Sequence, residues 1–249
     1  MLRRVFHRTP WVFSVLPLFV LWEIIGRMDL YLFVPSLTEI FKAGMGLVTS
    51  GRMYENGIFT VYLLVKGFIL SIGLGVLLGI LMGRYSLAEA FFGIYVDLFQ
   101  SAPASALVPV LILIFGLGPG SIVATVFIFT FFIVVVNVYT GVRGVNPRLL
   151  EMARSYGFSE WMTLRRVILP AAMPMILAGF RMGVGRAYNG VVLGEMLISI
   201  VGIGGLLMIF GSSFKMDRLF AMLFVIVVLA SLSMAGVQKL EKRLLRWME

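Results

Sequence analysis

The chain alternates long apolar segments with short polar ones. Nearly uninterrupted apolar runs cover residues 11–26, 57–83, 90–142, 172–200 and 219–238. A helix crosses a bilayer with about 20 apolar residues, so the run at 90–142 is too long for one crossing. The turn sequence Gly116-Leu117-Gly118-Pro119-Gly120 divides this run in two. The pattern therefore predicts an all-α membrane protein with six transmembrane helices, because a helix satisfies its own backbone hydrogen bonds in lipid.

Small residues recur at four-residue spacing in two of these runs. The second run contains Ser71, Gly75, Gly79 and Gly83, and the fifth contains Gly179, Gly183, Gly190 and Gly194. Such stripes allow helix backbones to approach closely. The sequence leaves two interpretations open, namely packing inside one chain or a face that lines a dimer seam or a moving path.

Composition agrees with a membrane protein and excludes several kinds of chemistry. The chain of 249 residues has a mean hydropathy of +1.02, with 60% hydrophobic and 13% charged residues. A soluble core of this size could not bury so much apolar surface. Cysteine is absent and His7 is the single histidine. We therefore expect no disulfide, metal centre or catalytic triad.

The basic residues predict the orientation of the chain. The net charge of +9 comes mainly from loops and termini, and nucleic acid is not needed to explain it. If both termini face the cytoplasm, most Lys and Arg outside the spans fall on that side. We divide the chain into an N-terminal span with an external loop at 1–56 and a core of five spans at 57–249. The polar segment 141–170 is then cytoplasmic.

This polar segment has the pattern of two short helices. Asn146-Pro147 favours a helix start, with Asn as the N-cap and Pro in the first turn. Gly157 favours a helix end, and Ser159 suits the cap of a second helix. Two roles fit such an element: a docking site for a soluble partner, or an ordinary amphipathic loop at the membrane surface.

The spacing inside the segment favours docking. Glu151-Met152-Ala153, Gly157 and Val167-Ile168-Leu169-Pro170 resemble the EAA signature of bacterial ABC-importer permease subunits. Met152 and Val167 depart from the family pattern, and both replacements keep an apolar side chain. The family also places its signature between the fourth and fifth of six spans.

The likeness extends to the subfamily that imports nitrate, alkanesulfonates, taurine and thiamine-precursor-like compounds. It rests on Pro35-Ser36, on Pro103 to Pro109 with Ile114-Phe115-Gly116, and on Gly202-Ile203-Gly204-Gly205-Leu206. The resemblance implies a permease in the bacterial inner membrane, which works with two cytoplasmic ATPases, a second permease copy and an external solute-binding protein. It implies a coupling helix whose docking residues are Glu151, Met152, Ala153, Arg154, Gly157 and Pro170. The chain has no phosphate-binding loop of its own, so ATP hydrolysis is expected on another subunit.

Polar side chains inside the spans are candidates for a translocation path, since they are costly in lipid. They are Lys66, Asp97, Gln100, Arg186 and Glu195. A path lined by such residues would suit a small anionic or zwitterionic solute. The alternative is pairing inside the protein, for example between Arg186 and Glu195, and Arg181 could extend to the headgroups.

Two other functions are weaker alternatives. A stand-alone secondary transporter or channel predicts inverted halves or a ring of like charges, which the sequence does not show. A membrane-embedded enzyme needs paired carboxylates, a Ser/His set or metal ligands at one depth. The sequence contains no such set.

Overall fold

The computed structural model describes residues 10–28, 33–198 and 201–246. His7 and the basic N-terminal tail, and the last two residues of the predicted fifth span, lie outside these residues. The described residues form helices and no strand, as expected for an all-α membrane protein. The helices are α2 (Pro10–Arg27), α3 (Leu37–Thr49), α4 (Arg52–Arg84), α5 (Ser86–Ser101), η1 (Ala104–Leu107), α6 (Val108–Phe115), α7 (Pro119–Arg143), α8 (Pro147–Ser155), α9 (Glu160–Thr163), η2 (Leu164–Ile168), α10 (Leu169–Ile198), α11 (Gly202–Ser212) and α12 (Met216–Leu244).

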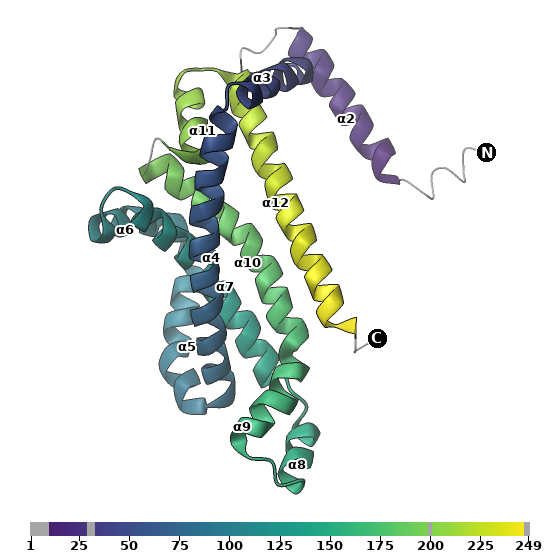
Figure 1. Cartoon of the computed structure of the whole chain (residues 1–249), viewed down its shortest axis with the longest axis vertical. Coiled ribbons are helices and arrows are strands. Elements are labelled where there is room, and N and C mark those ends of the chain that lie inside the picture. The colour runs from purple at the N-terminus through teal and green to yellow at the C-terminus, as the bar shows by residue number, and fades with distance from the viewer. Residues whose placement is uncertain (1–9, 29–32, 199–200, 247–249) are drawn as a thin grey trace, which may run out of the picture.

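Long helices form the body of the molecule, short helices lie at its two ends, and α6 projects from one side (Figure 1). Among the described residues, four helical segments are long and apolar enough to cross a membrane: Arg52–Arg84, Pro119–Arg143, Glu160–Ile198 and Met216–Leu244. Helix α5 and the bent continuation η1–α6 add a fifth segment if the pair is counted as one span. The first predicted span corresponds to α2, which leads away from the bundle at the α3 end (Figure 1). The number six stays a prediction.

The third predicted span is not straight. Helices α5 and η1–α6 meet at an angle of 100°. Pro103 lies at the break, and Ala102 before it is extended with φ −73° and ψ 143°. Proline has no N–H to continue the helix and disfavours a helical residue before it, so the two helices diverge. This segment is a broken span or a re-entrant loop.

The fifth span begins earlier than the apolar pattern indicated. We predicted a start near residue 172, but the chain is helical from Glu160 through Ile198. A π-helical turn, η2, joins α9 to α10, and the Leu169 N–H bonds the Leu164 carbonyl oxygen. Pro170 would break an ordinary helix, because it cannot donate to the preceding turn. The wider π turn just before it lets the helix continue.

Helix α7 lies between α4 and α10, and glycines make both contacts close. A Cβ atom placed on Gly79 would lie 2.6 Å from Val138 Cβ, and one on Gly190 would lie 3.0 Å from Val126 Cα. The same contact between α4 and α7 recurs at four levels: Gly67 with Val126, Gly75 with Val134, Gly79 with Val138, and Gly83 with Val142. The small-residue stripes therefore serve packing within one chain.

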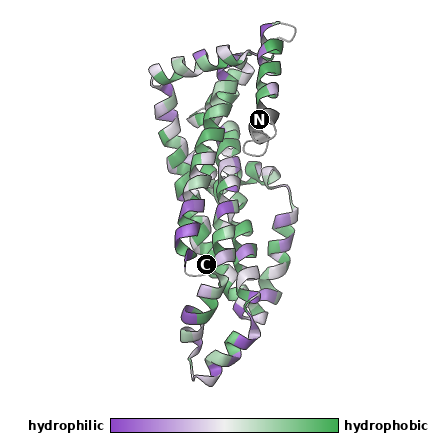
Figure 2. Ribbon diagram, turned by 90° about the vertical axis from the view of Figure 1, so that its right-hand side faces the viewer, coloured by the Kyte–Doolittle hydropathy of each residue, from purple (hydrophilic) through white to green (hydrophobic). Residues whose placement is uncertain are grey.

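The outer faces of the long helices are apolar. Large apolar side chains are exposed along α4, α5 and α12, for example Ile69, Phe91 and Val227. Figure 2 shows mostly hydrophobic residues along the body, with hydrophilic ones interspersed and present at both ends. Such a surface suits contact with lipid or with another membrane subunit.

Candidate functional site

Helix α8 begins as the sequence predicted. The Asn146 side chain accepts a hydrogen bond from the Arg148 N–H at 3.0 Å, and Pro147 is the first helical residue. The first N–H groups of a helix have no partner within it, so this side-chain acceptor stabilises the start of α8.

The end of α8 is a Schellman motif centred on Gly157. Gly157 has φ +69°, its N–H bonds the Arg154 carbonyl oxygen at 2.9 Å, and the Phe158 N–H bonds the Ala153 carbonyl oxygen at 3.0 Å. Glycine adopts this left-handed conformation without steric cost. Ser159 then caps α9 by accepting from the Met162 N–H at 3.3 Å. The chain therefore reverses direction sharply between the two short helices.

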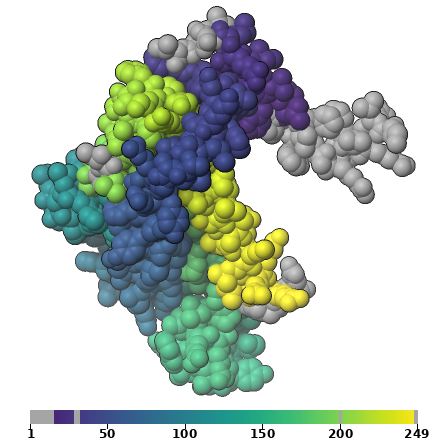
Figure 3. Space-filling model, turned by 45° about the horizontal axis from the view of Figure 1, so that its top comes forward, coloured from purple at the N-terminus to yellow at the C-terminus, as the bar shows by residue number. Residues whose placement is uncertain are grey.

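The two sides of α8 differ in exposure. Ala153 is completely buried, whereas Glu151, Met152 and Arg154 are exposed. Figure 3 shows α8 and α9 together as a lobe, the α8 lobe, at one end of the molecular surface. Trp161 on α9 is also exposed, at 68%. The lobe presents charged and apolar side chains away from the bundle, which suits contact with a soluble protein.

The lobe is joined to the bundle by an unbroken helix. The helical segment Glu160–Ile198 contains 39 residues, which corresponds to a length of about 58 Å. Half-buried Pro170 lies near its beginning, beside the π turn. Val145 and Ile168 pack in one apolar cluster with Val142 on α7. A displacement of the lobe would therefore reach the membrane helices directly.

Two predicted path residues line one pocket. Asp97 and Gln100 on α5 lie beside a cavity of about 470 Å³, whose wall also includes Glu89 and Tyr139. The Tyr139 hydroxyl donates to Glu89 at 2.5 Å, and Arg143 forms an ion pair with Glu89 at 2.9 Å. Glu89 thus has partners, while the Asp97 side chain is exposed.

Arg186 lies in a different place. It lines a pocket of about 550 Å³ together with Ser105 at the helix break and Asn189 on its own helix. Within the described part of the chain no acidic side chain pairs with Arg186, so the predicted pair with Glu195 is absent. A guanidinium group within a membrane helix needs water or an anion, and this pocket could supply either.

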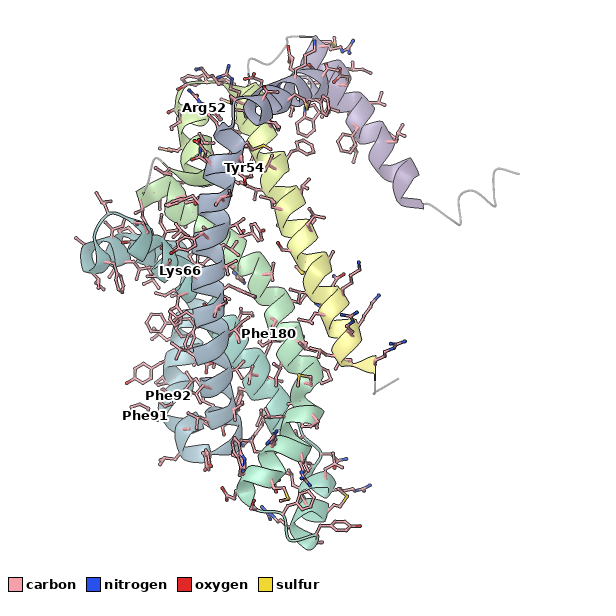
Figure 4. The ribbon with its side chains drawn as sticks, in the orientation of Figure 1. Arg52, Tyr54, Lys66, Phe91, Phe92 and Phe180 are labelled. Atoms are coloured by element: carbon pink, nitrogen blue, oxygen red, sulfur yellow. The ribbon has the colours of Figure 1, made fainter. Side chains whose placement is uncertain are left out.

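The other cations have contacts of their own. Lys66 is exposed on α4, about halfway along the helix in Figure 4, with its Nζ 4.7 Å from the centre of the Tyr62 ring. Arg181 forms an ion pair with Glu241 on α12 at 3.1 Å. Lys66 lines neither of the two pockets described above.

Glu195 is completely buried and hydrogen-bonded. Its carboxylate accepts from the Thr60 hydroxyl at 2.8 Å and from the Gly204 N–H at 2.9 Å. Sequence reasoning missed Thr60 and its neighbour Asn56. Their spacing of four residues on one face of α4, at the start of an apolar run, was the available signal.

Comparisons with known proteins cover most of the chain. The sequence profile of the family described as "Binding-protein-dependent transport system inner membrane component" matches residues 71–246. The putative aliphatic sulfonates transport permease protein SsuC of Bacillus subtilis is 31% identical, over 91% of this chain and 83% of that protein. The formylaminopyrimidine transport permease protein ThiX of Halalkalibacterium halodurans is 32% identical over 93% of both chains. The taurine transport system permease protein TauC of Escherichia coli is 25% identical, over 92% and 86%.

A solved structure has the same fold. A chain of the MetNI methionine ABC transporter in an inward-facing conformation superposes with a TM-score of 0.61 at 18% identity. The match covers 80% of this chain and 97% of that chain.

Proposed function

The chain belongs to the family of binding-protein-dependent transport system inner membrane components and is an ABC-importer permease of the sulfonate- and taurine-like subfamily, and we propose separate roles for two of its parts. The α8 lobe docks an ATPase, and the helices around Arg186 form the path of a small anionic or zwitterionic solute. The family and its relatives favour this function over a stand-alone transporter or channel.

The geometry of the α8 lobe carries the proposal. Docking requires a defined surface that protrudes from the membrane helices, and Glu151, Met152 and Arg154 provide exposed side chains on a helix with fixed ends. Coupling requires a stiff connection, which the helix Glu160–Ile198 supplies. An amphipathic loop resting on lipid needs neither the Schellman motif nor this continuity.

The partners follow from this arrangement. We propose two ATPase subunits that hydrolyse ATP, a second copy of this chain, and a solute-binding protein on the outer side. With the α8 lobe in the cytoplasm, both termini face the cytoplasm in this multi-pass inner-membrane protein. Residues 1–56 then form the peripheral span and loop, and residues 57–249 form the core with the coupling segment 141–170.

Arg186 supports an anionic or zwitterionic solute. Its guanidinium group offers several donors to a sulfonate or carboxylate, and Ser105 and Asn189 add polar groups to the same pocket. Three named relatives carry sulfonates, taurine and formylaminopyrimidine. We therefore propose an organic sulfonate as the first solute to test.

Purification and reconstitution test the proposed function. The permease, extracted in mild detergent from its own membranes, should bring along an ATPase with a phosphate-binding loop. Proteoliposomes that hold the complex and its binding protein should accumulate taurine or ethanesulfonate only when ATP is supplied on the ATPase side. Accumulation by the permease alone, without ATP, would establish the stand-alone transporter instead.

Replacing Arg186 by glutamine should slow solute uptake by at least about tenfold, since a charge-assisted hydrogen bond contributes roughly 1.5–3 kcal/mol. Arg186→Lys retains the charge and should keep much of the rate. ATP-driven uptake by both variants should be measured beside copurification of the ATPase, which neither substitution should change. Equal uptake by Arg186→Gln and the parent would remove Arg186 from the path.

A further inference from the structure

Helix α11 begins without a cap from its own sequence. Its N-cap residue, Val201, makes no side-chain cap bond. Three successive N–H groups of the first turn are nevertheless bonded by side chains from other helices. Gly202 donates to Asn56 Oδ1 at 2.8 Å, Ile203 to Thr60 Oγ1 at 2.9 Å, and Gly204 to Glu195 Oε2 at 2.9 Å.

Two of the three acceptors, Thr60 and Glu195, are also hydrogen-bonded to each other. The Thr60 hydroxyl lies 2.8 Å from Glu195 Oε1, so it accepts from Ile203 and can donate its proton to the carboxylate. Asn56 and Thr60 belong to α4, and Glu195 belongs to the last turn of α10. One bonded cluster therefore joins α4, α10 and α11.

Two glycines make room for this cluster. Gly202 has φ +92°, and a Cβ atom on it would lie 2.2 Å from Glu195 Oε1. A Cβ on Gly204 would lie 2.5 Å from the Val192 carbonyl oxygen. The Gly202-Ile203-Gly204 sequence is thus fitted to the buried carboxylate, because a side chain at Gly202 would displace the carboxylate and one at Gly204 would separate α11 from α10.

A buried carboxylate is a costly way to hold a helix. Removing a carboxylate from water is unfavourable unless hydrogen bonds and nearby positive potential compensate. The N-terminus of α11 supplies both, through N–H groups that have no partner within the helix and through its dipole. Apolar contacts alone would attach α11, since Ile203, Leu206 and Phe210 pack with Met222 of α12. Apolar packing is non-directional, whereas these hydrogen bonds fix where α11 sits.

We propose that Asn56, Thr60 and Glu195 form a latch, the α11 latch, that makes α11 move with α10 and the adjoining end of α4. These are positioning residues for transport. The latch lies at one end of the helical segment Glu160–Ile198, and the other end of this segment begins in the α8 lobe. The latch therefore carries displacement of the lobe to the opposite end of the molecule (Figure 1). The inference rests on the proposed docking of an ATPase to α8.

Paired substitutions in the assembled importer test the latch. Thr60→Val removes the hydroxyl at nearly constant volume, while Thr60→Ser keeps it. Glu195→Ala removes the carboxylate. Glu39→Gln is a matched control, because Glu39 also caps a helix at this end, accepting from the Ser36 N–H at 2.9 Å, but lies on α3 outside the latch.

The first measurement is the position of α11. The chain lacks cysteine, so spin labels on Tyr54→Cys and Met208→Cys, both exposed on α4 and α11, report one distance between these helices. Labelled chains diluted with unlabelled ones avoid distances between copies. We expect a narrow distribution in the parent, Thr60→Ser and Glu39→Gln, and a broad one in Thr60→Val and Glu195→Ala.

The second measurement is stimulation of ATP hydrolysis by the importer's own binding protein. Thr60→Val and Glu195→Ala should lose about tenfold in stimulation, in line with loss of a hydrogen bond to a charged group. Thr60→Ser and Glu39→Gln should respond like the parent. Copurification of the ATPase should be the same in all variants. If no ATPase copurifies with the parent, the result counts against the proposed function and not against the latch. Parent-like stimulation in both latch variants overturns the latch, whatever the distance distributions show.

Discussion

Gly79→Leu should prevent stable folding of the helix bundle, with a loss of about 3 kcal/mol or more. A Cβ at this position would lie 2.6 Å from Val138 Cβ and 2.8 Å from the Val135 carbonyl oxygen. The carbonyl belongs to the backbone of α7, which is held on its other side by α10. Neither helix can yield locally, so α4 and α7 must separate.

Gly73→Leu provides the matched control on the same helix. No atom lies within 4 Å of a Cβ placed there, and Gly73 is exposed. The two variants add the same side chain to α4 and differ only in what it meets. Resistance to unfolding in detergent, followed by circular dichroism, should fall sharply for Gly79→Leu and remain near the parent for Gly73→Leu. Equal stability of the two variants would show that α4 and α7 are not in this close contact.

Gly157→Val should weaken copurification of the ATPase about tenfold and lower ATP-driven uptake with it. A left-handed backbone costs an L-residue roughly 1–2 kcal/mol, and more for a β-branched side chain. No neighbour lies within 4 Å of a Cβ at Gly157, so the substitution acts through the backbone alone. It should open the Schellman motif and change the direction in which α8 presents Met152 and Arg154.

Gly157→Asn distinguishes an effect of backbone conformation from an effect of the added side chain, since asparagine tolerates the left-handed region. It should retain the ATPase and most of the uptake. Quantitative pull-down and uptake in proteoliposomes give both values from one preparation. Valine and asparagine variants with the same activity would argue against a docking role for α8.

Local signals in the sequence predicted the α8 lobe well. Asn146, Gly157 and Ser159 act on backbone groups within a few residues, so their roles follow from spacing alone. The capping box of α3, in which Ser36 and Glu39 bond each other's backbone N–H groups, is a contact of the same short range. The all-helical fold also followed from the apolar runs, because lipid requires internal backbone bonding.

Features that depend on distant contacts were not predictable in this way. Asn56 bonds Gly202 although 146 positions separate them, and no short-range pattern indicates that meeting. Hydropathy identified Arg186 and Glu195 equally as polar residues in a span. Packing then placed the arginine at a pocket and the glutamate in a bonded cluster. Pro103 was a signal for the angle between α5 and η1–α6, but the apolar residues on both sides of it favoured one continuous span.

The repeated glycine–valine contacts between α4 and α7 leave one other alignment of the two helices partly satisfied. Sliding α7 by four residues, about 6 Å, would bring Val134 and Val138 to the next glycines, Gly79 and Gly83, but would place Val126 against Ser71. Ser71 interrupts the glycine series, and its hydroxyl lies 3.2 Å from the Phe127 carbonyl oxygen. A serine in place of a glycine at that level is bulkier and polar, so it disfavours the shifted alignment. Ser71 thus helps to set the registry of these two helices.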